Sequence, residues 1–119
     1  MTSALRWLMV LVIITACGTT SVDRIAAGDI EAGRATFAAS CVECHGAEAL
    51  GSDQGPPLVD SIYRPSHHSD EAFLVAVRRG VPAHHWSFGP MLAVPGLSDT
   101  DISDIVAYVR SLQRAAGIE

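Results

Sequence analysis

Apolar residues recur at the spacing of one helix face in three stretches of the chain, residues 29–40, 69–79 and 98–116. Between these stretches, residues 46–65 and 81–96 are rich in Gly and Pro, which predicts loops. No segment of useful length alternates between apolar and polar residues with the period of a strand. The pattern therefore predicts an all-α domain of three to four helices joined by long loops.

Each predicted helix begins at a residue whose side chain can accept hydrogen bonds from the first-turn N–H groups, namely Asp29, Ser69 and Ser98. Asp101 stands at the capping-box position of the third helix, and Leu97 before it can pack on the first helical turn as a hydrophobic staple. The apolar faces are expected to be Ile30, Gly33, Phe37 and Cys41 in the first helix, Phe73, Leu74 and Val77 in the second, and Ile102, Ile105, Val106, Val109 and Leu112 in the third.

The first residues have the order of a secretory signal peptide. Arg6 precedes an apolar run that is shorter than the about 20 residues needed to cross a bilayer. Small residues then lead to Cys17, as in bacterial lipoprotein signals, where the cysteine is acylated; the alternative is an ordinary signal peptide with an incidental cysteine. We expect a signal peptide over residues 1–16, a lipidated tether over 17–27 and a folded domain over 28–119.

The charge balance is acidic. The chain has 119 residues and a formal net charge of −5, and all of its basic residues are arginine. Removal of residues 1–16 takes away only Arg6 among the charged residues, which leaves 7 basic and 13 acidic side chains. Nucleic acid and anionic membrane surfaces are therefore disfavoured as electrostatic partners, and a partner with a neutral or basic docking face fits better.

A pattern typical of c-type haem attachment, Cys-x-x-Cys-His, occurs at residues 41–45. On a helix, Cys41, Cys44 and His45 share one face, so two thiols can form thioethers with one haem c while the imidazole becomes the proximal iron ligand. One alternative is half of a zinc site, which only histidines could complete. The other is a dithiol redox pair, for which the sequence lacks a βαβ pattern. With Cys17 acylated, haem attachment accounts for all three cysteines.

The chain resembles class I monohaem cytochromes c over essentially all of its length after the tether, in segments 33–46 (GRATFAASCVECHG), 55–58 (GPPL), Met91, 97–102 (LSDTDI) and 108–112 (YVRSL). The resemblance implies a small cytochrome c fold wrapped around one covalently bound haem, with the N-terminal and C-terminal helices crossed beside it. Gly33 and Phe37 would then meet Tyr108, and the missing side chain of Gly33 would permit close approach. Residues 56–58 would lie on the proximal side and orient the imidazole of His45 through a backbone carbonyl; the alternative is a plain rigid turn.

The resemblance also places the distal iron ligand at Met91, the only methionine after the signal segment. A thioether is a soft ligand suited to haem iron, although methionine also fills gaps in cores. In the family's common form a proline follows this methionine, whereas here Pro90 precedes it. Four histidines offer bis-histidine ligation as the alternative, or they lie solvated on the surface; these are His67, His68, His84 and His85. Three residues with polar tips could hydrogen-bond the haem propionates, or they lie half-buried at the surface; these are Tyr63, Arg64 and Trp86.

The combined prediction is a lipid-anchored carrier of single electrons rather than an enzyme. It would face the periplasm or extracytoplasmic side and exchange electrons with redox proteins of the cell envelope, such as a dehydrogenase, an oxidase or another cytochrome. Because His45 and Met91 would fill both axial positions, no small-molecule substrate is expected. The alternatives are a permanent cytochrome subunit of a dehydrogenase or terminal oxidase, a peroxidase or haem sensor with an exchangeable sixth ligand, and a metal-binding or dithiol lipoprotein without haem.

Overall fold

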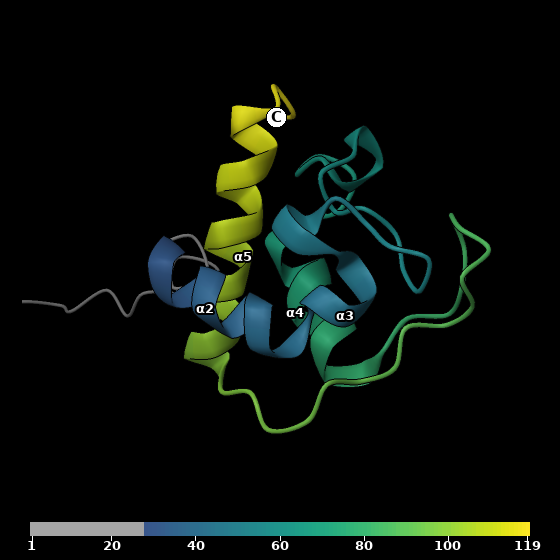
Figure 1. Cartoon of the computed structure of the whole chain (residues 1–119), viewed down its shortest axis with the longest axis horizontal. Coiled ribbons are helices and arrows are strands. Elements are labelled where there is room, and N and C mark those ends of the chain that lie inside the picture. The colour runs from purple at the N-terminus through teal and green to yellow at the C-terminus, as the bar shows by residue number, and fades with distance from the viewer. Residues whose placement is uncertain (1–27) are drawn as a thin grey trace, which may run out of the picture.

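The computed structural model describes residues 28–119 as a small helical domain, which confirms the predicted all-α fold. Within this part of the chain the only extended pairing is an isolated antiparallel bridge between Val81 and Met91. The helices, arranged as in Figure 1, are α2 (Ile30–Ser40), α3 (Val42–His45), α4 (Asp70–Arg79) and α5 (Asp99–Ala115), with short 3-10 helices η1 (Ala47–Ala49) and η2 (Ser61–Tyr63).

The predicted signal peptide, the tether and Cys17 lie outside the described residues. Among residues 28–119, none of the helices is long and apolar enough to cross a bilayer.

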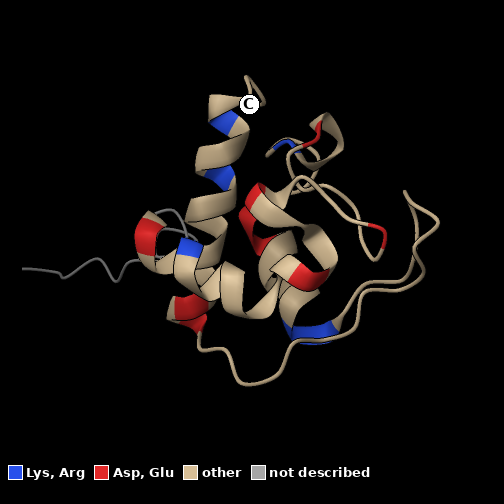
Figure 2. Ribbon diagram, viewed as in Figure 1, with Lys and Arg blue, Asp and Glu red and all other residues tan. Residues whose placement is uncertain are grey.

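All three predicted helix starts are confirmed. The carboxylate of Asp29 accepts hydrogen bonds from the first turn of α2, and the hydroxyl of Ser69 accepts one from the first turn of α4. In α5, the hydroxyl of Ser98 accepts from the N–H of Asp101 at 3.1 Å, and the Asp101 carboxylate accepts from the N–H of Ser98 at 2.7 Å. Figure 2 shows acidic residues at the starts of α4 and α5 and basic residues near their ends, an order that favours the helix dipole.

Helices α2 and α5 cross in close contact, as expected from the resemblance (Figure 1). A Cβ on Gly33 would lie 1.9 Å from the backbone oxygen of Asp104, so only glycine allows this approach. Phe37 packs against Tyr108 with ring centroids 5.5 Å apart. Gly33 thus meets α5 one turn before Tyr108. Both Phe37 and Tyr108 belong to the main core cluster, which also contains Ala49, Ile105 and Val109.

A second core cluster joins α4 to α5 through Val77, Ile102 and Val106. Met91 and Leu97, from the long loop between the two helices, pack against this cluster. The predicted apolar faces of α4 and α5 are therefore confirmed. The face of α2 is not covered along its whole length: Ile30 is 46% exposed. The reason is that α2 crosses α5 instead of lying along it (Figure 1), so only part of its stripe is covered.

Arg110 of α5 fastens the loop before α4 to the core. Its side chain is 7% exposed, and its guanidinium donates to Asp70 at 2.7 Å, to the carbonyl of Tyr63 at 2.7 Å and to the carbonyl of His68. The same group lies 4.7 Å from the centre of the Phe73 ring. One buried cation thereby holds residues 63–70 in place against α5.

Candidate functional site

The Cys-x-x-Cys-His segment forms a tight turn where α2 ends and α3 begins. Cys41 leaves the helical conformation, with φ −127° and ψ −25°, and its carbonyl accepts hydrogen bonds from the N–H groups of Cys44 at 3.2 Å and His45 at 2.9 Å. These bonds have the spacing of a helical turn. Both thiols and the imidazole are therefore carried by one short backbone unit.

The imidazole of His45 is oriented by the loop that follows the motif. Its Nδ1 lies 2.9 Å from the carbonyl oxygen of Pro56. A carbonyl can only accept, so Nδ1 donates and the lone pair of Nε2 remains free to bind a metal. Burial lowers the pKa of His45, against the opposing effect of the Pro56 carbonyl, and this favours the neutral form that ligates. The orienting carbonyl expected from the resemblance is present.

The loop of residues 46–57 also packs tightly on the motif. The hydroxyl of Ser52 donates to the carbonyl of Cys44 at 2.7 Å, and the N–H of Gly51 donates to the carbonyl of His45 at 2.6 Å. A Cβ on Gly55 would lie 2.8 Å from the Cys44 carbonyl oxygen. The loop therefore fixes the Cys-x-x-Cys-His turn through hydrogen bonds to the carbonyl groups of Cys44 and His45.

The two thiols differ in their surroundings. Cys41 is half-buried beside the main core cluster, and burial raises its pKa from 9.0 to about 11, with a smaller contribution from Cys44. Cys44 is exposed. Neither cysteine is in a disulfide, so both sulfurs are available for covalent bonds to another group.

Met91 lies in the loop between α4 and α5, where the sequence predicts the distal ligand. The N–H of Val81 donates to the Met91 carbonyl and the N–H of Met91 to the Val81 carbonyl, both at 2.9 Å. A third bond, from the N–H of Val94 to the carbonyl of Val77 at 2.8 Å, closes the loop on α4. The backbone of Met91 is thus tied to a residue just after α4, and the backbone three residues beyond Met91 is tied to α4 itself.

Of the three residues considered for propionates, two lie together. A side-chain hydrogen bond joins Tyr63 to Trp86. Burial raises the pKa of Tyr63, and this effect is larger than the lowering by the hydrogen bond with Trp86. The guanidinium of Arg64 is directed to its own turn, where it donates to the carbonyl of Ser61 at 3.0 Å and to the hydroxyl of Ser66 at 3.1 Å.

The four histidines outside the motif gather in one place, which the sequence reasoning missed. His67 and His68 belong to the turn before α4, and His84 and His85 to the loop after it. Ring centroids of His67 and His85 lie 5.3 Å apart, and those of His68 and His85 lie 5.1 Å apart. The only available signal was that both pairs are consecutive, which says nothing of their distance in space.

The residues of the motif fit a covalently bound haem. A haem of this type needs two sulfurs and one neutral imidazole on a single short segment, with the ring nitrogen away from the iron held by a hydrogen bond. The free thiols of Cys41 and Cys44 and the Pro56-bound imidazole of His45 meet each of these needs.

Comparisons with known proteins agree with this site. The cytochrome c family profile matches residues 30–113. The chain is 33% identical over 95 residues to cytochrome c-554(547) of Halothiobacillus neapolitanus, an alignment that covers 73% of this chain and all of that protein. It is also 33% identical over 84 residues to the cbb3-type cytochrome c oxidase subunit CcoP of Rhodobacter capsulatus, over 68% of this chain and 28% of that subunit. The chain therefore belongs to the cytochrome c family, as a class I monohaem member with one covalently bound c-type haem and a role in electron transfer.

Proposed function

We propose that the protein carries single electrons between redox proteins of the cell envelope, with His45 and Met91 as axial ligands of its haem iron. The observation that carries this proposal is the hydrogen bond from His45 Nδ1 to the Pro56 carbonyl, which leaves Nε2 free beside the two thiols. The haem supplies an iron that alternates between the ferric and ferrous states.

Cys41 and Cys44 would hold the haem at its vinyl groups. Each thiol adds its sulfur to one vinyl carbon and its hydrogen to the other, so a thioether forms without loss of an atom. Because Cys41 is also packed against the core cluster of α2 and α5, this linkage ties the haem to the crossed helices. The protein thereby fixes the position of the redox centre relative to its own surface.

Met91 is proposed as the sixth ligand because it is the only methionine beyond residue 9 and both of its backbone groups are bonded to Val81, just after α4. A ligand on a loop closed by hydrogen bonds is held in place through redox cycles. With both axial positions filled, the iron has no site for a substrate, which favours a carrier over a peroxidase or a gas sensor.

Replacement of the ligand tests the assignment. Met91→His should lower the midpoint potential and abolish the sulfur-to-iron charge-transfer absorption of the oxidised protein, because a second imidazole replaces the thioether. Leu92→Ala is the matched control, since Leu92 is the next residue and is 79% exposed; this variant should keep the band. Absence of the band from the wild-type protein, or its survival in Met91→His, would contradict the assignment. Ready binding of carbon monoxide to the wild-type ferrous protein would favour the sensor or peroxidase.

We also propose that residues 1–16 are a signal peptide, that Cys17 is acylated, and that residues 17–27 tether the domain of residues 28–119 to a membrane on its extracytoplasmic side. The support is the small-residue segment before Cys17 and the odd number of cysteines, of which haem attachment would use Cys41 and Cys44. Cys17→Ser should move the haem-stained protein from the membrane fraction to the soluble fraction. A Cys17→Ser protein that stays with the membrane would exclude the lipid anchor.

A permanent subunit of an oxidase is the second candidate. It is favoured by the likeness to CcoP, although this chain spans only 28% of that subunit's length. Purification from detergent-solubilised membranes separates the two candidates: a fixed subunit co-migrates with its enzyme through successive columns, whereas a carrier separates from it because redox encounters are weak and small in area.

A further inference from the structure

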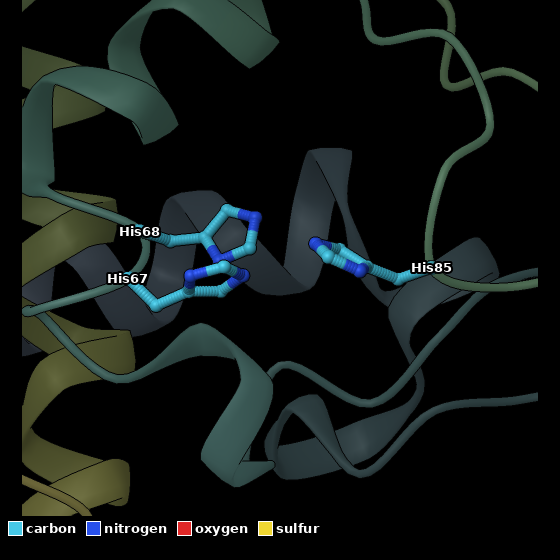
Figure 3. A group of neighbouring side chains, drawn as sticks. All are labelled: His67, His68 and His85. Atoms are coloured by element: carbon cyan, nitrogen blue, oxygen red, sulfur yellow. The ribbon is translucent and has the colours of Figure 1, made fainter.

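The imidazoles of His67, His68 and His85 converge from two separate loops. Figure 3 shows His67 and His68 pointing from one loop toward His85, which extends from the other. One possible ligand atom from each of the three residues lies within 4.8 Å of the others. Two loops that are distant in sequence thus present three nitrogen donors to one point.

These distances are close to those of a metal site. A tetrahedral Zn²⁺ with bonds of about 2.0–2.1 Å holds its nitrogens about 3.3 Å apart. The donors of this cluster need to approach by roughly 1.5 Å at most to reach that geometry. His67 and His85 are exposed, so rotation of their side chains can supply this movement without disturbing the core.

The half of the cluster nearest the core is already held in place. The N–H groups of His67 and His68 both donate to the carbonyl of Arg64, at 3.0 and 2.9 Å, and the His68 carbonyl accepts from buried Arg110. The Nδ1 of His68 lies 2.7 Å from the carbonyl of Ile62, so this nitrogen donates and Nε2 keeps its lone pair. Hydrogen bonding of the second ring nitrogen to a backbone carbonyl is typical of histidines that bind metals.

We propose that His67, His68 and His85 bind one divalent ion of the later first-row transition metals, with Zn²⁺ as the representative ion. Neutral imidazole is a preferred ligand of Zn²⁺, Cu²⁺ and Ni²⁺, and water would complete the coordination of a surface ion with three protein ligands. The positive charge of nearby Arg110 is offset by its ion pair with Asp70, at 2.7 Å.

The ion would join the two loops that flank α4. One is the turn held to α5 by Arg110, and the other is the loop of residues 82–90 that leads into Met91. Bound metal would therefore restrict the segment that precedes Met91.

Equilibrium dialysis of the full-length, haem-loaded protein, produced without a histidine tag, against ZnCl₂ tests the site. One Zn²⁺ per protein is expected, and His85→Gln and His67→Gln should each weaken binding at least about tenfold, the scale seen even when an outer-shell partner of a metal is lost. His84→Gln is the matched control. His84 lies beside the cluster, with its ring centroid 4.1 Å from that of His85, but it is outside the three-donor set. It should keep the wild-type affinity.

Three outcomes would overturn the proposal. These are no binding of Zn²⁺ at millimolar concentration, equal binding by wild type and His85→Gln, and an equal loss in His84→Gln. X-ray absorption at the zinc edge gives an independent readout and should show imidazole nitrogens about 2.0 Å from the metal. The haem spectrum of His85→Gln should match that of wild type, because His85 is not proposed as an iron ligand, and a change of haem spin state in this variant would place His85 at the iron instead.

Discussion

Replacement of Gly33 by alanine tests how closely α2 and α5 must approach. The added Cβ would lie 1.9 Å from the backbone oxygen of Asp104, 2.3 Å from its carbonyl carbon and 3.0 Å from the nitrogen of Ile105. All three atoms belong to the backbone of a helix, so no side chain can rotate away from the clash. The two helices must move apart by more than about 1 Å, and a gap of that size forfeits up to half of the dispersion energy of the contacts it opens.

The expected loss of stability is the difference between two terms. Overpacking costs about 1–3 kcal/mol, and the rigid surroundings of Gly33 place this substitution at the upper end. Alanine also favours the helix by about 1 kcal/mol relative to glycine. The net prediction is a loss of about 2 kcal/mol in the free energy of unfolding, or about 8–16 °C in Tm for a domain of this size. Phe37 and Tyr108, whose rings lie 5.5 Å apart across the same interface, would share in the loss.

The assay is guanidinium unfolding of the haem-loaded protein, followed by far-ultraviolet circular dichroism. Ala35→Gly is the matched control, because Ala35 lies on the exposed side of the same helix. It should lose about 1 kcal/mol from helix propensity alone. If Gly33→Ala proves as stable as wild type, the close approach of the two backbones does not exist and the account of the crossing fails.

Two further predictions concern the contacts that hold the loops. Arg110→Met should destabilise the protein by about 3–5 kcal/mol, since it leaves the partly buried carboxylate of Asp70 without its cation. The control in the same unfolding assay is Arg114→Met, an exposed position, which should stay within about 0.5 kcal/mol of wild type. Equal effects of the two substitutions would refute the role given to Arg110. Hydrogen bonds from Ser98 lower the pKa of Asp101 from its usual 3.8, so the stabilisation by this carboxylate is complete above that value and is lost as the pH falls through the lowered pKa. Asp101→Asn should therefore show a smaller drop in unfolding midpoint between neutral pH and acid than wild type, whereas Asp53→Asn, on an exposed loop, should show the wild-type drop.

Local chemistry explains why the helices could be predicted from the sequence. A cap acts on N–H groups two or three residues away, so Asp29, Ser69 and Ser98 mark helix starts wherever the helices later pack. The Cys-x-x-Cys-His turn is likewise closed by bonds within five residues. The apolar stripe of α5 predicted its buried face, but the exposure of Ile30 in α2 could not be predicted, because it depends on the angle at which two helices cross.

The sequence by itself determined the helices and their caps, and the segment able to carry a haem. It also contains one methionine beyond residue 9, Met91, which we propose as the second iron ligand. Tertiary structure alone decided the burial of Arg110, whose partners Asp70 and the carbonyl of Tyr63 come from other segments of the chain. It also decided that the rings of His68 and His85 lie close together, which nothing in the sequence indicates. The physical reason is range: capping and helical periodicity act over a few residues, whereas the pairing of a buried charge or the convergence of two loops depends on how the whole chain packs.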